Sequence, residues 1–142
     1  IDNSIYAAAD AIEVLVSTTE EPFTLFLADN GNGMTEEVLK ESMRFPSASP
    51  DHSRDVTDLG RFGLGMKTAS FAQTRHFTVL SRSKGNGNYS GRTWDVDNLE
   101  NGEWKLKVNG PSEVVALLNE YSLASKKYLS SHENFEPNTI II

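Results

Sequence analysis

Three glycines within six positions, followed closely by a lysine, are the feature that most constrains this chain. They lie in the stretch Gly60-Arg61-Phe62-Gly63-Leu64-Gly65-Met66-Lys67. Glycine reaches backbone conformations closed to other residues, and a ligand can approach its N–H group without meeting a Cβ atom. A helix opening just beyond, at residues 68–71, would add unpaired N–H groups and a positive dipole end, which favour phosphate. The stretch therefore predicts a loop that wraps a polyphosphate, with Lys67 supplying an added positive charge.

Two well-known phosphate-binding motifs do not fit this stretch. A P-loop has the pattern G-x-x-x-x-G-K-[ST], whereas here Met66 separates Gly65 from Lys67. The dinucleotide fingerprint is G-x-G-x-x-G, whereas Gly60, Gly63 and Gly65 have the reverse spacing, G-x-x-G-x-G. A glycine pattern alone is a weak signal, so the residues upstream decide what kind of site it belongs to.

An apolar stretch upstream ends at a carboxylate. Residues 23–28 are almost all apolar and predict a central strand, which ends directly at Asp29. Gly31 and Gly33 follow in the pattern D-x-G-x-G. Ligands in open α/β sheets gather at strand ends, which favours a functional role for Asp29. Taken alone, the same residue could simply cap the glycine-rich turn.

The order of the predicted elements indicates an α+β fold. Apolar runs and alternation predict strands over 11–16, 23–28, 76–83, 91–96, 104–108 and 138–142. Helices are predicted over 1–9, from the N-cap Thr35 through Met43, beyond the glycines to about 73, and from Pro111. We expect a two-layer α/β sandwich in which helices cover one face of a mixed, mostly antiparallel sheet.

Two of these helices are predicted to have an apolar face that packs on the sheet. In the helix that follows Thr35, this face consists of Val38, Leu39 and Met43. In the helix that begins at Pro111, the predicted buried side consists of Val114, Val115, Leu117, Leu118 and Tyr121.

Composition limits the class of protein. A length of 142 residues with 38% hydrophobic content fits a single domain over residues 1–142. The absence of cysteine excludes disulfides and thiolate metal sites, and the three histidines lack metal-ligand spacing. No apolar run reaches the roughly 18 residues of a membrane span, so we expect a cytoplasmic protein without a membrane partner. A net charge of −7 argues against nucleic-acid binding by this domain alone.

Residues from about 45 to 60 are interpreted as a lid. They contain two prolines, several serines and threonines, and charges of both signs, without hydrophobic periodicity. A long loop without secondary structure inside a compact domain is usually functional or disordered. Because this segment directly precedes the glycine-rich stretch, we expect it to cover a bound ligand.

Three motifs together resemble those of the GHKL ATPase superfamily, which includes gyrase B, Hsp90, histidine kinases, MutL and MORC proteins. They are Asp2-Asn3 on the first helix, Asp29-x-Gly31-x-Gly33, and Gly60-x-x-Gly63-x-Gly65 after a variable lid. Their order and spacing agree over nearly the whole chain. The residues around the last motif are more similar to the Hsp90-like and MORC-like branch than to histidine kinases. The resemblance implies the Bergerat form of the α+β sandwich, with ATP and Mg²⁺ as ligands.

The resemblance implies an adenine pocket around Asp29. The carboxylate of Asp29 would accept a hydrogen bond from the adenine amino group, and guanine offers a carbonyl at that position instead. Gly31 and Gly33 would let the chain pass close to the base. Met34 would line the apolar face of the base.

The resemblance also implies a magnesium and phosphate site. Asn3 would bind Mg²⁺ through its amide oxygen, a hard ligand suited to that ion. The triphosphate would be wrapped by Gly60, Arg61, Phe62, Gly63, Leu64, Gly65 and Met66, with Lys67 near its charged end. Arg61 has a second interpretation, because it could instead pair with a carboxylate of the lid such as Asp58.

The chain departs from the family pattern in three places. Relatives place a Gly-Thr pair under the adenine, and here Asn138 replaces that glycine before the candidate Thr139. Tyr6 stands where relatives often have aspartate. The catalytic glutamate of the family lies four residues before the magnesium-binding asparagine. Counted from Asn3, that position falls before Ile1, so no catalytic residue is visible and the chain is expected to be excised from a longer protein.

The predicted function is Mg²⁺-dependent hydrolysis of ATP to ADP and phosphate, with ATP closing the lid and driving homodimerisation. Two alternatives stay open. One is a histidine-kinase catalytic domain that passes phosphate to a partner. The other is an interaction module that binds ATP without hydrolysing it. Contacts with nucleic acid are expected only through other domains.

Overall fold

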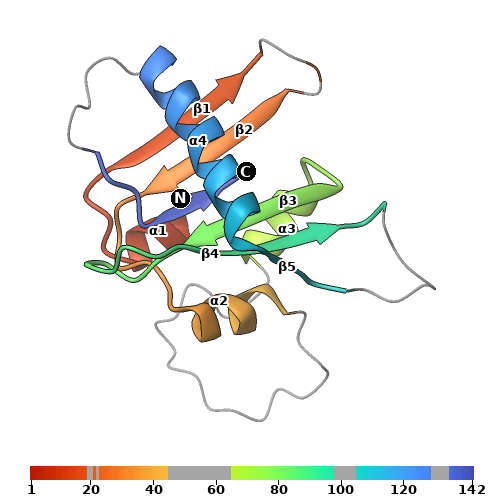
Figure 1. Cartoon of the computed structure of the whole chain (residues 1–142), viewed down its shortest axis with the longest axis horizontal. Coiled ribbons are helices and arrows are strands. Elements are labelled where there is room, and N and C mark those ends of the chain that lie inside the picture. The colour runs from red at the N-terminus through yellow and green to blue at the C-terminus, as the bar shows by residue number, and fades with distance from the viewer. Residues whose placement is uncertain (19–20, 22, 45–64, 98–104, 129–134) are drawn as a thin grey trace.

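The residues that the structure describes form a six-stranded sheet in the order β1-β2-β6-β3-β4-β5 (Figure 1). In this computed structural model the described residues are 1–18, 21, 23–44, 65–97, 105–128 and 135–142. The strands are β1 Ile12–Ser17, β2 Thr24–Asp29, β3 His76–Ser81, β4 Ser90–Asp95, β5 Lys107–Asn109 and β6 Thr139–Ile141. Neighbouring strands in this order pair in the antiparallel sense.

The short strand β6 joins the two halves of the sheet. β1 pairs with β2 and β3 pairs with β4, whereas β6, near the end of the chain, pairs with both β2 and β3. Its central residue Ile140 stands opposite Ala28 on one side and Leu80 on the other. All three side chains are buried. The strand β6 therefore links the β1–β2 hairpin to the β3–β4 hairpin within one sheet.

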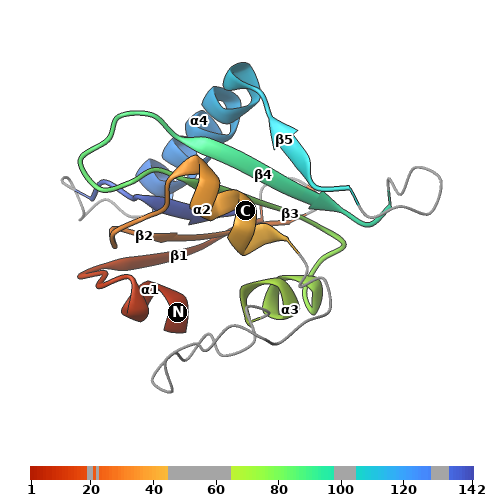
Figure 2. The ribbon, with the colours of Figure 1, turned by 90° about the horizontal axis from the view of Figure 1, so that it is seen from below.

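The helix α4, Pro111–Tyr128, packs across one face of the sheet (Figure 2). Proline suits the first position of a helix because its fixed φ is helical and it has no N–H group to satisfy there. The hydrophobic core on this face consists of Leu15, Phe26, Ala28, Leu80, Val114, Tyr121, Ala124 and Ile140. Neither α4 nor any other helix within the described residues is long and apolar enough to cross a membrane.

The helices α1 Asp2–Tyr6 and α3 Gly65–Phe71 lie on the opposite face of the sheet (Figure 2). The helix α2 Glu36–Met43 packs on that face too, through its core contacts. The core there consists of Leu39 and Met43 from α2 with Phe77, Val79 and Trp94 from the sheet. Phe71 of α3 meets Phe77 edge to face, with 5.0 Å between the ring centroids. The indole Nε1 of Trp94 donates to the main-chain oxygen of Met43 at 2.8 Å, which ties β4 to the end of α2.

The predicted α+β class is confirmed, but helices cover both faces of the sheet and not one. The side chains of Val79 and Leu80 show this directly, because adjacent strand residues point to opposite faces. Val79 packs in the core with α2, whereas Leu80 packs in the core with α4. Each face of the sheet therefore has its own hydrophobic core.

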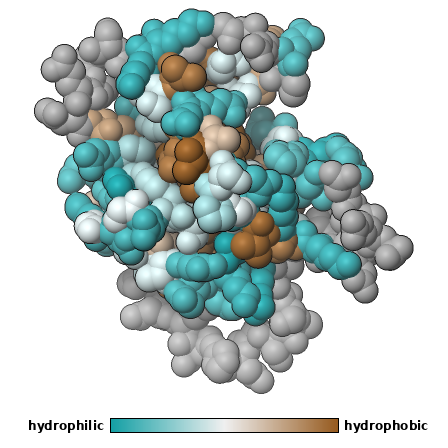
Figure 3. Space-filling view, in the orientation of Figure 1, coloured by the Kyte–Doolittle hydropathy of each residue, from teal (hydrophilic) through white to brown (hydrophobic). Residues whose placement is uncertain are grey.

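The predicted helix faces are only partly correct. Leu39 and Met43 are buried and the Thr35 side chain caps α2 by accepting from the Val38 N–H, as expected. Val38 and Val115, both predicted to be buried, are 50% and 56% exposed. Successive helix residues point about 100° apart, so a helix resting on a sheet buries one stripe and not its neighbours. The face seen in Figure 3 shows separated hydrophobic patches among hydrophilic residues.

The predicted strand boundaries need one further correction. The strand expected over 104–108 is found at Lys107–Asn109, and residue 104 lies outside the described residues. The other strands agree with their predicted ranges to within a residue or two.

A buried carboxylate lies under α4, in an otherwise apolar core. Glu13 of β1 is 5% exposed, and its Oε2 accepts hydrogen bonds from the Tyr121 hydroxyl and from Ser125 Oγ. Its Oε1 has no hydrogen-bond partner among the described residues. Burial and the adjacent carboxylate raise the pKa of Tyr121 well above its usual range, so its hydroxyl stays a donor.

We predict that Tyr121→Phe lowers the free energy of unfolding by about 2 kcal/mol, because the Glu13 carboxyl group loses a hydrogen-bond donor while it stays buried. Urea denaturation measures this change. Tyr6→Phe is the matched control, because Tyr6 is exposed and its substitution is expected to change stability little. Equal stabilities of the two variants would contradict a stabilising role for the Tyr121 hydroxyl.

Candidate functional site

Three polar side chains form a row across the middle of the sheet. Asp29 at the end of β2 stands opposite Thr139 of β6, which stands opposite Ser81 at the end of β3. Directly opposed residues project from the same face of a sheet. All three are buried, Asp29 to 5% exposure. The predicted pair Asp29 and Thr139 is therefore brought together by the pairing of β6 with β2.

The carboxylate of Asp29 is held on both oxygens. Ser4 Oγ of α1 donates to Oδ2 at 2.9 Å, and the main-chain N–H of Gly31 donates to Oδ1 at 3.0 Å. An ionised carboxylate offers about four lone-pair positions. Asp29 is thus oriented by two donors and keeps capacity to accept a hydrogen bond from a ligand.

Ser81 connects the other members of the row. Its hydroxyl lies 2.9 Å from Thr139 Oγ1, accepts from the Met34 N–H at 2.9 Å, and donates to the main-chain oxygen of Asn138 at 3.0 Å. These bonds fix the segment after Asp29 against β3 and β6. Met34 packs against the α2 core and is half-buried.

Sequence reasoning did not identify Ser4 or Ser81. Ser4 follows Asn3, and a serine that points inward from a short helix has no distinguishing spacing. Ser81 follows the apolar residues Val79 and Leu80 at the end of a strand, and that change of polarity was the available signal.

Gly31 and Gly33 are required by contacts within the chain. A Cβ on Gly31 would lie 2.7 Å from the main-chain oxygen of Ala7. Gly33 has φ of +63°, and a Cβ there would lie 1.8 Å from the main-chain oxygen of Arg82. The turn after Asp29 is thus pressed between the end of α1 and the end of β3. This close packing explains both glycines without reference to a ligand.

The helix α1 places Ser4 toward the sheet and leaves Asn3 exposed. Tyr6, which departs from the family pattern, is also exposed. Among the described residues no group of three or more histidine, aspartate or glutamate side chains is placed to hold a metal ion.

Lys67 is buried, at 2% exposure, against the end of α2. Its Nζ donates to the main-chain oxygen of Ser42 at 3.0 Å and to that of Arg44. A cation suits the C-terminal end of a helix, where carbonyl groups lack partners. Burial lowers the pKa of Lys67. A contact between Lys67 and phosphate would require these bonds to be exchanged.

The remaining predicted phosphate residues are described only in part. Gly65 is the first residue of α3, and Met66 packs against the core that contains Leu39. Residues 60–64 and the predicted lid lie outside the described residues. The predicted wrapping of a triphosphate by this loop therefore stays a prediction.

Comparison with known proteins decides the family. The family model described as histidine kinase-, DNA gyrase B-, and HSP90-like ATPase matches residues 1–124. The chain belongs to this ATPase family. The matched residues include α1, the Asp29 turn and the glycine-rich stretch, whereas Thr139 lies beyond them.

The chain is also similar to HtpG chaperones. Chaperone protein HtpG of Shewanella sediminis is 30% identical over 104 residues, which are 66% of this chain and 16% of that protein. Chaperone protein HtpG of Alkalilimnicola ehrlichii is 30% identical over 106 residues, with coverages of 68% and 16%. The chain thus spans 16% of the length of these relatives.

The predicted GHKL and Hsp90-like resemblance is confirmed by these matches. The closer resemblance to MORC proteins is not tested by them. In this chain Asp29 stands opposite Thr139 and accepts from the N–H of Gly31, so the three residues lie close together. The individual roles of these residues toward a ligand remain predictions.

We predict that Gly33→Ala destabilises the protein by about 3 kcal/mol or more, because strain at positive φ adds to a clash with the main-chain oxygen of Arg82, just beyond β3. Gly85→Ala is the matched control, since Gly85 also has positive φ, +83°, but a Cβ there meets no atom within 4 Å. Its expected cost is about 1 kcal/mol, from backbone strain alone. Thermal and urea denaturation compare the two, and equal costs would contradict the close packing at Gly33.

Proposed function

We propose that this domain binds ATP with its adenine over the row Asp29, Thr139 and Ser81, and hydrolyses it in the presence of Mg²⁺. The observation that carries the proposal is the buried Asp29 carboxylate, held by Ser4 and Gly31 with accepting capacity left. Membership of the ATPase family supports the choice of nucleotide and of reaction.

The chemistry of Asp29 favours adenine over guanine. An ionised carboxylate only accepts hydrogen bonds. The exocyclic amino group of adenine donates, whereas guanine has a carbonyl oxygen at the same position. That oxygen would face the carboxylate without a proton between them, and an unpaired buried acceptor costs about 1–3 kcal/mol. Met34 would contribute apolar contact to the base and Thr139 a second polar contact.

The proposed magnesium site depends on the exposed amide oxygen of Asn3. Mg²⁺ prefers oxygen ligands, keeps several waters, and is commonly bound by few protein groups together with phosphate oxygens. One amide beside a nucleotide fits that preference. When bound, the ion would neutralise charge that develops on the phosphates. The glycine-rich stretch would supply main-chain N–H groups to the same phosphates.

The work of the domain is proposed to be conformational. A ligand shifts a protein between two states only if it binds one of them better. By resemblance to the family, ATP would favour a state in which the lid closes and two copies associate. Sedimentation of the protein with and without Mg-ATP tests the association step. Because the HtpG relatives are chaperones, we propose that the complete protein acts on client proteins.

We predict that Asp29→Ala weakens ATP binding by tenfold or more, on the order of one lost hydrogen bond to a charged group. Calorimetric titration of Mg-ATP and Mg-GTP measures this, and the unaltered protein is expected to prefer ATP. Asp97→Ala is the matched control, because Asp97 is an exposed carboxylate paired with Arg75 on another part of the surface. Equal binding of ATP and GTP, or no effect of Asp29→Ala, would contradict the adenine pocket.

For Asn3 we predict a different pattern. Asn3→Ala is expected to weaken Mg-ATP binding about tenfold or less and to change metal-free ATP binding little, because only the ion contacts its amide. Titrations with Mg²⁺ and with a chelator separate the two. Asn119→Ala is the control, an exposed asparagine on α4 across the sheet. An equal loss of both ligands would argue that Asn3 contacts the nucleotide directly.

A further inference from the structure

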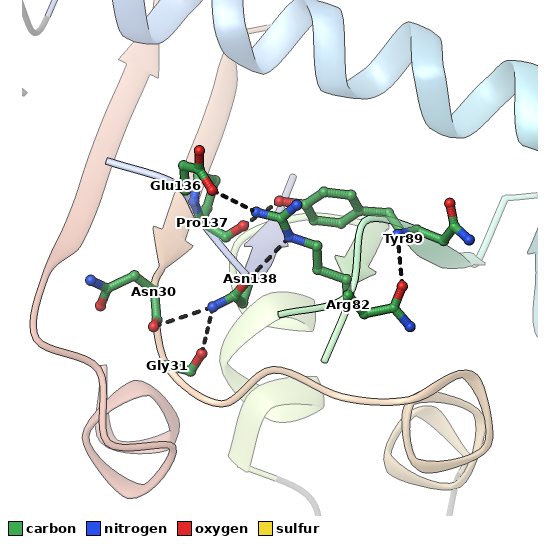
Figure 4. Close-up of polar contacts among 9 residues, drawn as sticks. Asn30, Gly31, Arg82, Tyr89, Glu136, Pro137 and Asn138 are labelled. Atoms are coloured by element: carbon green, nitrogen blue, oxygen red, sulfur yellow. Dashed lines mark hydrogen bonds and ion pairs between the residues drawn. The ribbon is translucent and has the colours of Figure 1, made fainter. Parts of the chain in front are cut away.

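The side chain of Asn138 lies against the turn that follows Asp29, beside Asn30 and Gly31 (Figure 4). Asn138 is 5% exposed and precedes β6. Its Nδ2 donates first to the main-chain oxygen of Asn30 at 3.3 Å and second to that of Gly31 at 2.8 Å. Its Oδ1 accepts from Arg82 Nε at 3.1 Å. These partners determine which way the amide points, because a carbonyl only accepts and a guanidinium only donates.

The first of these contacts acts on the Asp29 carboxylate through one peptide group. The oxygen of Asn30 and the N–H of Gly31 belong to the same planar unit and point in opposite directions. Asn138 binds the oxygen, and Asp29 Oδ1 accepts from the N–H at 3.0 Å. Rotation of this peptide would break one of the two bonds. Asn138 therefore sets the direction of the donor that orients Asp29.

The second contact fixes the next peptide group in the same way. Asn138 binds the oxygen of Gly31, while the N–H of Asn32 donates to the main-chain oxygen of Ala7 at 2.7 Å. In both peptide groups of the turn the oxygen and the N–H group are therefore hydrogen-bonded. Asn138 binds both oxygens, whereas the N–H groups donate to Asp29 and to Ala7 at the end of α1.

Arg82 holds Asn138 from the other side. Its guanidinium carbon lies 4.8 Å from the centre of the Tyr89 ring, and its Nη2 lies 3.5 Å from Glu136 Oε2 (Figure 4). The Tyr89 hydroxyl donates to the main-chain oxygen of Pro137. The loop between β3 and β4 and the segment before β6 thus hold the guanidinium in place.

These groups form a chain of hydrogen bonds with one direction. It runs from the Arg82 guanidinium through the Asn138 amide and the Asn30–Gly31 peptide to the Asp29 carboxylate. Bonds in such a chain polarise one another, and a cation at the donor end with an anion at the acceptor end strengthens each.

We propose that Asn138 and Arg82 are positioning residues for adenine recognition, and that they act by orienting the Gly31 N–H that holds Asp29. The proposal rests on the proposed function, since it assumes that Asp29 accepts from the adenine amino group. Neither side chain needs to touch ATP. Their effect is confined to the hydrogen bond between Asp29 and the amino group of the base.

A suitable pair of ligands isolates that hydrogen bond. Purine riboside triphosphate differs from ATP by a hydrogen in place of the exocyclic amino group. Asn138→Ala and Arg82→Gln are expected to weaken ATP binding about tenfold, the scale of one hydrogen bond to a charged group, and to change binding of the analogue little. The ratio of the dissociation constant of the analogue to that of ATP should therefore fall in both variants. Calorimetric titration of both ligands into each variant measures this ratio.

Two further variants separate positioning from general support of the fold. Asn109→Ala removes an asparagine that accepts from Thr93 Oγ1 at 2.9 Å at the far edge of the sheet. It should leave the ATP preference unchanged whatever its effect on stability. Arg82→Lys retains a positive donor and should preserve more of the preference than Arg82→Gln. An equal loss of ATP and analogue binding in Asn138→Ala, or equal behaviour of the two Arg82 variants, overturns the proposal.

A spectroscopic measurement covers the case in which Asn138→Ala does not fold. Arg82 is partly exposed, so Arg82→Gln is the milder change. The proton resonance of the Gly31 amide reports its hydrogen bond to Asp29 and should move upfield in Arg82→Gln. An unchanged resonance overturns the role of the guanidinium.

Failure of this inference is distinguishable from failure of the proposed function. If the unaltered protein does not prefer ATP over the analogue, the adenine pocket is wrong and this inference falls with it. If the preference exists and Asp29→Ala removes it while Asn138→Ala retains it, the pocket stands and the inference alone is overturned.

Discussion

The insertion of β6 between β2 and β3 is the interaction on which the rest of the structure depends. Its main-chain bonds join two hairpins that would otherwise have separate edges. The same pairing brings Thr139 beside Asp29 and Ser81, so the row of polar side chains exists only when β6 is in place. The pairing of β6 thus forms the sheet and aligns the polar side chains of the candidate site at the same time. A sheet edge left open at this point would expose unpaired N–H and carbonyl groups together with the candidate site.

The two faces of the sheet show two ways of burying a carboxylate. Under α4, Glu13 has donors on one oxygen, and its other oxygen has no partner among the described residues. On the opposite face, Asp29 has a donor on each oxygen. A buried polar group is tolerated when hydrogen bonds replace those it would make with water. The donors around Asp29 come from α1 and from its own turn, which orients the carboxylate and leaves it able to accept from a ligand.

Local patterns in the sequence were sufficient for most elements and for the family. Apolar runs located the strands, Thr35 marked the start of α2, and the spaced glycines with Asp29 indicated a nucleotide site. Such signals depend on nearest neighbours along the chain, where backbone propensity and side-chain alternation act directly. They did not show that Val38 and Val115 would be exposed. Which side of a helix is buried depends on the position and rotation that the helix takes when it packs on the sheet.

The sequence by itself determined the α+β class, the membership of the ATPase family and the candidacy of Asp29. Only the tertiary structure decided which groups hold that carboxylate. Ser4 lies 25 residues from Asp29 along the chain, and Asn138 lies 107 from Gly31. Contacts at such separations depend on strand order and register. No local periodicity encodes these contacts, because they form only when segments that are distant in the sequence come together in the sheet.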